Sequence, residues 1–304
     1  MENKGVYLVD AAVATIWTNP DSPRGIDQGA VSNPVLLREW LDSLTFEALL
    51  DLCNSNLVQS QALCGQEVMV LEEKGDWVLV VVPEQPSSKN SHGYPGWMPK
   101  GQLKKKEEDY TGNGVAVVTS PTSLLYHDDG SSWMELSFQT RLPLVEESED
   151  WVKVKTPSGT GLLRKDGTAV YASVVEIPKG NGQQIVEAGK AFLDLPYLWG
   201  GMSGFGFDCS GFSYAMCKAN GYIIPRDAHD QAKEGENVAL DQLKPGDLLF
   251  FAYDEGKGAI HHVGIYYGNG QMIHSPKTGK TIEVIDLKDT IYERELCAAR
   301  RYWT

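Results

Sequence analysis

The amino-acid sequence predicts an α+β protein in which two small β-barrels precede a domain of helices and a strand-rich segment. One motif of strand, acidic turn and Asp-Trp strand occurs twice in the first half of the chain. After residue 178 the apolar residues recur at helical spacing, and from about residue 240 they form the short runs of strands. At 304 residues the chain is long enough for two or three domains, which we place at 1–112, 113–177 and 178–304.

The repeated motif occupies residues 68–80 and 142–154. In both copies a strand leads into a polar turn, an Asp-Trp pair follows, and the next side chains alternate between apolar and polar. The flanking segments also correspond, 14–20 with 116–121 and 93–99 with 159–163. This repetition predicts two barrels of related ancestry.

The first copy contains an insertion of about forty residues, roughly 21–61, which is longer than an ordinary connection between strands. Within it, residues 33–41 and 46–53 show helical periodicity behind a capping residue or a proline, which predicts a helical hairpin docked on the first barrel. A long polar loop follows at 83–96. Tyr94 on this loop either packs on its own barrel or reaches into a neighbouring active site.

The charge balance restricts the partners of the chain. Lys and Arg number 27 against 41 Asp and Glu, which gives a formal net charge of −14. Such a chain repels phosphate backbones and anionic membrane surfaces, so we expect neither a nucleic-acid partner nor a membrane partner. No run approaches the roughly 18 apolar residues of a membrane-spanning helix.

The five cysteines include no Cys-x-x-Cys pair and fit neither a disulfide framework nor a zinc site, so we expect no metal and no cofactor. The N-terminus has neither the basic start nor the apolar run of a signal peptide. These features predict a cytoplasmic protein, although a secreted protein whose leader has been removed would give the same sequence.

A candidate nucleophile lies where a glycine-rich loop meets a helix. The loop runs into Asp208, and Phe212, Met216 and their neighbours then follow at helical spacing. Cys209 is therefore expected at a helix N-terminus, where unpaired N–H groups and the macrodipole favour a thiolate. A lone cysteine in this position is otherwise a small buried apolar residue.

Two histidines lie on a predicted β-hairpin, and their relative position depends on the turn. A two-residue turn at Asn269-Gly270 would send His262 and His274 to opposite faces of the sheet. A three-residue loop at 268–270 places Gly264 opposite His274. His262 and His274 then become diagonal neighbours on one face, ~7–8 Å apart at the backbone, with room between them because Gly264 has no side chain. We predict this second register.

A cysteine at a helix start, a histidine on a later strand and a polar residue behind that histidine form the nucleophilic arrangement of papain-like enzymes. Cys209 would attack a carbonyl carbon, His262 would accept and return the proton, and His274 would orient the His262 ring. The Cys209 N–H and the Tyr197 hydroxyl would hold the oxyanion. His261 is expected to face away from His274 because side chains alternate along a strand.

These segments resemble known families. The repeats resemble bacterial SH3-like domains, which bind cell-wall peptides or pack beside a catalytic domain. Residues 208–211, 262–266 and 272–274 resemble the motifs of NlpC-type cysteine peptidases, whose catalytic domain is papain-like. The whole chain resembles YkfC-like γ-D-glutamyl-L-diamino acid endopeptidases of Bacillus-type bacteria. That resemblance implies cleavage of the bond between D-Glu and diaminopimelate or Lys in murein peptides with a free N-terminal L-Ala.

The resemblance implies substrate contacts from seven side chains, Asp208, Ser210, Arg226, Asp227, Trp199, Tyr94 and Glu67. A substrate ammonium needs anionic and hydroxyl partners, which Asp208 and Ser210 beside the nucleophile can supply. Tyr94 would close the pocket at the L-Ala end, and Glu67 is a weaker candidate for the ammonium. Each has a structural alternative: Asp208 as a helix cap, Ser210 as a first-turn residue, and Arg226 with Asp227 as a surface ion pair.

Two other functions remain open at this point. One is a cell-wall peptide-binding protein with a degenerate enzyme domain, although such a protein would not need Cys209, His262 and His274 together. The other keeps the fold but changes the bond that is cleaved or transferred, because a fold does not fix a function.

Overall fold

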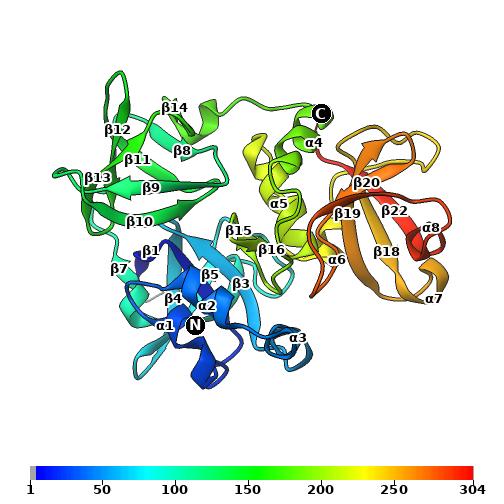
Figure 1. Cartoon of the computed structure of the whole chain (residues 1–304), viewed down its shortest axis with the longest axis horizontal. Helices are drawn as coiled ribbons and strands as arrows, with labels where there is room; N and C mark the ends of the chain where they lie inside the picture. The colour runs from blue at the N-terminus through cyan, green and yellow to red at the C-terminus, as the bar shows by residue number, and fades with distance from the viewer. Residues whose placement is uncertain (1–4, 304) are drawn as a thin grey trace. The chain divides into compact units, whose positions relative to one another are not determined.

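The structure, a computed structural model, describes residues 5–303 and consists of two compact units (Figure 1). The first unit comprises the chain up to Glu84 together with His92–Ile177 and Ser203–Phe205. The second comprises Gln85–Ser91, Pro178–Met202 and the chain from Gly206 onward. No described helix combines the length and the hydrophobicity that crossing a membrane requires.

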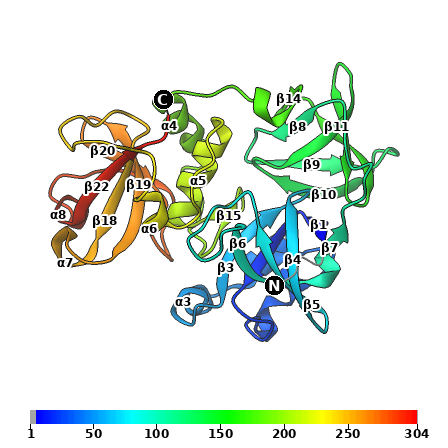
Figure 2. The same ribbon diagram turned by 180° about the vertical axis from the view of Figure 1, so that it is seen from behind.

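The first unit contains two seven-stranded antiparallel sheets, which we call the first and second barrels (Figure 2). The first barrel consists of β1 (Val6–Val9), β2 (Val13–Trp17), β3 (Val58–Leu63), β4 (Glu67–Lys74), β5 (Trp77–Val82), β6 (Tyr94–Pro99) and β7 (Leu103–Lys105). The second consists of β8 (Val115–Val118), β9 (Thr122–Tyr126), β10 (Ser132–Ser137), β11 (Arg141–Glu147), β12 (Trp151–Thr156), β13 (Gly159–Arg164) and β14 (Thr168–Tyr171).

The two sheets have the same strand order, which confirms the internal repeat. The order β3-β2-β6-β5-β4-β1-β7 becomes that of the second barrel when seven is added to each number. The Asp-Trp motif forms the β4–β5 and β11–β12 hairpins, as predicted. The predicted match of residues 14–20 with 116–121 is wrong, because β2 corresponds to β9 and residues 115–118 form β8, the counterpart of β1. Short apolar strands carry too little sequence signal to fix such an alignment.

The insertion between β2 and β3 is helical, as predicted. It contains α1 (Gln28–Val31), α2 (Leu37–Ser43) and α3 (Phe46–Asn54). Thr45 caps α3 by accepting a hydrogen bond from the Ala48 N–H. The fully buried Asp27 accepts hydrogen bonds from Arg24 and from the Trp40 indole and so fixes the helices to one another.

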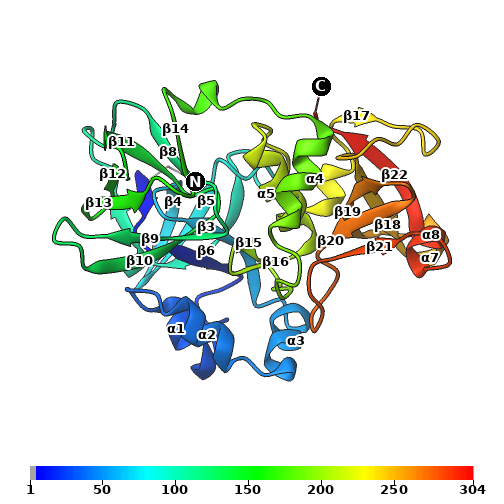
Figure 3. The same cartoon turned by 45° about the horizontal axis from the view of Figure 1, so that its top comes forward.

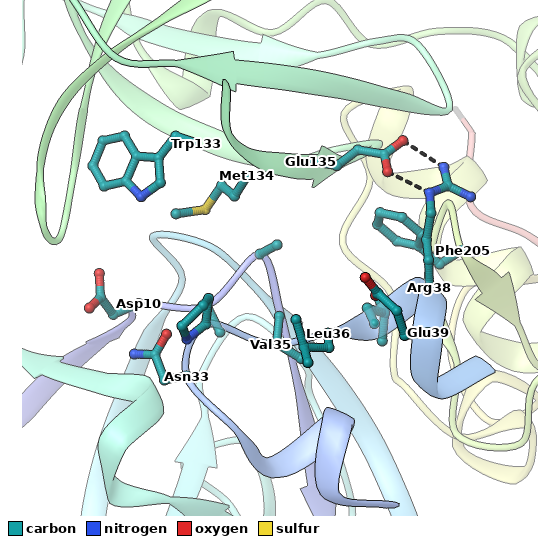
Figure 4. A pocket seen from close by; sticks show the side chains of 14 residues that line it. Asp10, Asn33, Val35, Leu36, Arg38, Glu39, Trp133, Met134, Glu135 and Phe205 are labelled. Atoms are coloured by element: carbon teal, nitrogen blue, oxygen red, sulfur yellow. Dashed lines mark hydrogen bonds and ion pairs between the residues drawn. The ribbon is translucent and has the colours of Figure 1, made fainter. Parts of the chain in front are cut away.

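Within this unit the insertion also contacts the second barrel (Figure 4). Arg38 of α2 forms a bidentate ion pair with Glu135 of β10, with both N–O distances at 2.6 Å. Beside this pair lies a pocket of about 330 Å³, lined by Trp133 and Met134 and by apolar residues of the insertion. The insertion therefore connects the two barrels.

The second unit contains a six-stranded sheet of order β17-β22-β18-β19-β20-β21. Its strands are β17 (Glu236–Asn237), β18 (Leu248–Ala252), β19 (Ile260–Gly268), β20 (Gln271–His274), β21 (Glu283–Asp286) and β22 (Leu296–Arg301). Its helices are α4 (Gly182–Lys190), α5 (Cys209–Ala219), α6 (Ala228–Gln231), α7 (Tyr253–Gly256) and α8 (Ile291–Glu295). A short hairpin, β15 (Met202–Ser203) with β16 (Gly206–Phe207), precedes α5.

Helices α4 and α5 pack together and against β19 (Figure 3). Gly189 permits the close approach, since a Cβ there would lie 3.0 Å from the Phe212 ring and 3.3 Å from the Ile273 side chain. Ile273 therefore faces these helices. His274, the next residue of β20, points to the opposite face of the sheet.

The β19–β20 hairpin has the predicted parity but a different turn. Asn269 and Gly270 form a two-residue turn with φ of 53° and 78°, as a type I′ turn requires. Tyr267 is an extra residue on β19, so the register shifts and Ile265 lies opposite Ile273. This β-bulge restores the register that the predicted three-residue loop would have given.

Candidate active site

Cys209 is the first residue of α5, as predicted. Asp208 is the N-cap, and its side chain accepts a 2.6 Å hydrogen bond from the Gly211 N–H. A Cβ at Gly211 would lie 2.1 Å from the Gly201 carbonyl oxygen, so only glycine allows the helix to begin this close to the loop. The glycine-rich loop and the cap together fix the position of the cysteine.

The Asp208 carboxylate is held by the protein on all sides. Arg226 donates to it from two nitrogens at 2.7 and 3.1 Å and is 1% exposed. The Gly200 N–H at 3.0 Å, the Gly211 N–H and the Ser210 hydroxyl at 3.3 Å complete the set. Two carboxylate oxygens offer about four acceptor sites, so these donors occupy nearly all of the hydrogen-bonding capacity. Arg226 is thus a buried partner of Asp208, and the alternative of a surface pair with Asp227 is wrong.

The segment after Arg226 is held by the long loop between β5 and β6, a contact that the sequence does not predict. The Arg226 N–H donates to the Pro86 carbonyl at 2.9 Å, and the Ser88 N–H donates to the Asp230 carboxylate at 2.9 Å. Lys89 forms a 3.0 Å ion pair with Asp227. The length and polarity of the loop are the only sequence signals for this contact.

The two predicted histidines lie together. His262 Nε2 is 2.8 Å from His274 Nδ1, and the ring centroids are 5.0 Å apart. Gly264 leaves room for them, since a Cβ there would lie 3.2 Å from the His274 Cβ. Phe251 and Tyr292 pack around the His262 ring at 5.7 and 5.3 Å. The sequence prediction missed Tyr292, since no motif connects this residue of α8 with the hairpin.

His261 is directed elsewhere. Its Nε2 lies 3.0 Å from the Glu295 carboxylate, and its ring stacks on Tyr253 at 4.1 Å. His261 therefore faces away from His274, as the alternation of the strand predicts, and the role of His262 as general base stays a prediction.

The Cys209 thiol is close to the backbone of Val263, the residue after His262. Although part of Cys209 reaches the surface, burial of the thiol raises its pKa to about 12, and the charge of Asp208 raises it further. Hydrogen bonding to the Val263 backbone lowers the pKa, but less than burial raises it. The expectation of a thiolate at the helix N-terminus therefore omits the larger effect, which is desolvation.

Burial also lowers the pKa of both histidines. The pKa of His262 lies well below 6.5, with the neighbouring His274 and His261 as smaller causes. The pKa of His274 falls to about 4. Burial therefore disfavours the charged forms of the Cys209 thiol and of both imidazoles in the free protein.

The other predicted site residues are divided between the units. Tyr197 is 6% exposed, pairs with Phe207 in an isolated β-bridge and lies in the second unit, as does the half-buried Trp199. Tyr94, buried at the start of β6, and Glu67, exposed and paired with Lys106, lie in the first. The proposed substrate contacts of these residues stay predictions.

Three side chains in the second unit could in principle bind a metal ion. The ligand atoms of Asp227, His229 and Asp230 lie within 4.8 Å of one another. Lys89 and Lys233 already form ion pairs with the two carboxylates, at 3.0 and 3.1 Å. These lysines supply the positive charge that a cation would bring, and the expectation that no metal takes part stays a prediction.

Comparison with known proteins agrees with this geometry. Residues 194–301 match the NlpC/P60 family, and residues 118–171 match the YKFC SH3b2 domain. The γ-D-glutamyl-L-lysine dipeptidyl-peptidase of Bacillus subtilis (strain 168) is 53% identical over 296 residues, 97% of this chain and 98% of the relative. The chain belongs to the NlpC/P60 family.

A solved structure of an NlpC/P60 family protein from Bacillus cereus ATCC 10987 superposes with a TM-score of 0.95 at 44% identity, covering 99% of this chain and all of the other. Murein DD-endopeptidase MepH of Escherichia coli (strain K12) is 42% identical over 116 residues, which is 37% of this chain and 42% of the relative. The predicted α+β fold and the predicted class of enzyme, a cysteine peptidase, are confirmed.

The buried Asp208–Arg226 pair predicts a large stability effect. In Asp208→Ala, the buried charge of Arg226 loses its carboxylate partner and α5 loses its cap, so the free energy of unfolding should fall by about 3–5 kcal/mol. Urea denaturation followed by circular dichroism measures this change. The matched control is Glu187→Ala, which breaks an exposed ion pair with Lys190 and should leave the midpoint unchanged. Equal denaturation midpoints for both variants would contradict a stabilising role for the buried Asp208–Arg226 pair.

The lowered pKa of His274 predicts a stability that depends on pH. The folded state disfavours the charged ring, so the unfolded chain binds more protons between pH 6.5 and about 4. The contribution of the neutral His274 ring to the free energy of unfolding is complete above pH 6.5. It is lost as the pH falls from 6.5 to about 4, a change of about 3 kcal/mol. In His274→Asn, the change in the free energy of unfolding between pH 6.5 and pH 4 should be smaller by this amount. In His127→Asn, at an exposed position, it should equal that of the wild type. An unchanged slope in His274→Asn would refute the assignment.

Proposed function

We propose that this protein is a cysteine peptidase that hydrolyses the γ-D-glutamyl-L-diamino acid bond of murein peptides with a free N-terminal L-Ala. The observation that carries the proposal is the length of the similarity. The γ-D-glutamyl-L-lysine dipeptidyl-peptidase matches nearly the whole chain, both barrels included, whereas the DD-endopeptidase matches only 37% of it. A specificity that depends on the barrels would be shared with the first of these two relatives and not with the second.

In the proposed mechanism Cys209 attacks the γ-carbonyl carbon of D-Glu. As the sulfur–carbon bond forms, the thiol proton passes to His262, whose other nitrogen faces His274 at 2.8 Å. The Cys209 N–H and the Tyr197 hydroxyl stabilise the oxyanion. When the tetrahedral intermediate collapses, His262 returns the proton to the amine of the departing diamino acid. A water, deprotonated by His262, then releases L-Ala-γ-D-Glu from the sulfur.

The starting state of this mechanism is a neutral thiol beside a neutral imidazole. Burial raises the pKa of the Cys209 thiol to about 12 and lowers that of His262, so an ion pair is not favoured before substrate binds. The substrate carbonyl and the oxyanion donors make the proton transfer favourable at the moment of attack. A cysteine that rests as a thiol is also oxidised more slowly than a thiolate.

Two carboxylates, those of Asp208 and Asp227, are the candidates for binding the substrate ammonium. The donors on Asp208 leave it little capacity for a further bond, so its main role is to position Cys209 and Ser210. Asp227 is better suited to the ammonium, because its partner Lys89 is 38% exposed and a substrate ammonium can replace it. None of the five cysteines, all within the described chain, forms a disulfide, which fits the cytoplasmic setting that we propose.

The test is cleavage of L-Ala-γ-D-Glu-L-Lys and of its N-acetylated form, with release of Lys followed by chromatography. We expect the free-amine peptide alone to be cleaved, and Cys209→Ala to abolish the reaction. Asp227→Asn should raise KM for the free-amine peptide by about tenfold, a loss typical of one charged contact.

The other outcomes identify the alternatives. Equal cleavage of both peptides would refute recognition of a free N-terminus. Cleavage of a D-Ala-containing cross-linked peptide in their place would indicate the bond specificity of a DD-endopeptidase. Binding of either peptide without cleavage would indicate a peptide-binding protein.

A further inference from the structure

The second ring nitrogen of His274 faces a carboxylate that lies outside the predicted site. His274 Nε2 is buried and has no hydrogen-bond partner among the described residues. Glu283 Oε1 lies 3.7 Å from it, and the Glu283 side chain is 43% exposed. This distance exceeds the ~2.9 Å of an N–H···O hydrogen bond, and a small rotation of the exposed Glu283 side chain would bring the two atoms into contact.

The pairing of strands β20 and β21 brings the Glu283 carboxylate close to His274. Glu283 of β21 is the direct cross-strand partner of His274 on β20, so both side chains project from the same face. On β19, the same face carries His262, which lies opposite Phe251 of β18. A single row of side chains therefore runs across four strands and ends at Glu283.

Tyr292 gives independent evidence that these groups share one site. Its ring packs edge-on against His274, with centroids 5.1 Å apart. Burial raises the pKa of its hydroxyl to about 12, and the nearby charges of Glu283 and Cys209 raise it further. The Tyr292 hydroxyl therefore lies within electrostatic reach of both Glu283 and Cys209.

We propose that Glu283 is a positioning residue that fixes the tautomer of His274 and, through it, the direction of proton transfer. A carboxylate only accepts hydrogen bonds, so it holds the His274 proton on Nε2. His274 Nδ1 is then an acceptor, and His262 must place its own proton on Nε2 to donate to it. The lone pair of His262 Nδ1 is left free to take the thiol proton of Cys209.

No proton moves onto Glu283 in this arrangement. When His262 becomes an imidazolium, its Nε2–H still donates to His274. The Glu283 carboxylate then stabilises the positive charge indirectly, through the hydrogen-bonded His274 ring. The opposite tautomer of His274 would put two N–H groups against each other or place the His262 proton on the nitrogen that must act as the base.

The experiment measures the tautomer directly and rests on the proposed function only for its kinetic part. Protein labelled with ¹⁵N in histidine is studied by long-range ¹H–¹⁵N NMR, with the His274 signals assigned from His274→Asn. In the wild type we expect a protonated Nε2 and an unprotonated Nδ1 on His274. Glu283→Lys replaces the acceptor with a donor and should reverse this tautomer.

Activity on L-Ala-γ-D-Glu-L-Lys is measured with the same proteins. Glu283→Gln, which can present either an acceptor or a donor, should lower kcat about tenfold with KM within about twofold, and Glu283→Lys should lower kcat about a hundredfold. Asp286→Lys is the matched control, since this exposed residue lies on the same strand but on its opposite face. We expect wild-type kinetics and the wild-type tautomer from it.

A His274 tautomer that is the same in Glu283→Lys and the wild type would overturn the proposal, whatever the rates. Unchanged kcat in Glu283→Lys with a reversed tautomer would also overturn it, because the tautomer would then not direct the reaction. If the wild type cleaves no peptide, the proposed function fails, and the NMR result alone decides whether Glu283 sets the tautomer.

Discussion

The buried ion pair between Asp208 and Arg226 is the interaction on which the rest of the site depends. Its carboxylate caps α5, holds the Gly200 N–H of the preceding loop and binds the Ser210 hydroxyl. Its guanidinium belongs to a segment that a loop from between β5 and β6 holds in place. The charged pair thus links the loop at Gly200, the start of α5 and the segment at Arg226, and the distant 85–91 loop contacts that segment. Breaking one partner leaves an uncompensated buried charge, which makes the arrangement stiff as well as costly to disturb.

Burial has a second consequence, for the reactivity of the cysteine. The helix N-terminus and the Val263 backbone both favour a thiolate, but desolvation opposes it and has the larger effect. The same desolvation keeps His262 and His274 neutral. Burial thus opposes a resting ion pair, and we propose that the charges of Cys209 and His262 develop only during the reaction. Its hydrogen-bonding direction is set by the row His262, His274 and Glu283 across the sheet.

Periodic features of the chain were predictable from sequence, and contacts between distant segments were not. The Asp-Trp motif predicted two related barrels because it combines strand alternation with a distinctive turn. The parity of His262 and His274 was predicted correctly, but for a three-residue loop, whereas the structure uses a two-residue turn and a bulge at Tyr267. A bulge has no reliable sequence signature, since it depends on how neighbouring strands twist.

The partner of Arg226 and the pKa of the Cys209 thiol could not be predicted for a related reason. An arginine next to an aspartate suggests a local ion pair, and only the folded chain brings Asp208 within 2.7 Å. Desolvation likewise depends on every segment that surrounds the sulfur. Tyr292 and Glu283 reach the histidines from α8 and β21, and nothing in their own sequence marks them as neighbours of a nucleophile.

The proposed catalysis starts from a neutral Cys209–His262 pair, which the ionisation of Cys209 can verify. The rate of alkylation of Cys209 by iodoacetamide can be followed between pH 5 and 10 by mass spectrometry of the peptide that contains it, with His262→Ala as the comparison. We expect a rate that is low at pH 6 and rises continuously with pH, because the thiol is protonated over most of this range and the thiolate fraction grows with pH. A rate that is already high at pH 6, constant to pH 8 and lost in His262→Ala would reveal a preformed thiolate–imidazolium pair and contradict the account.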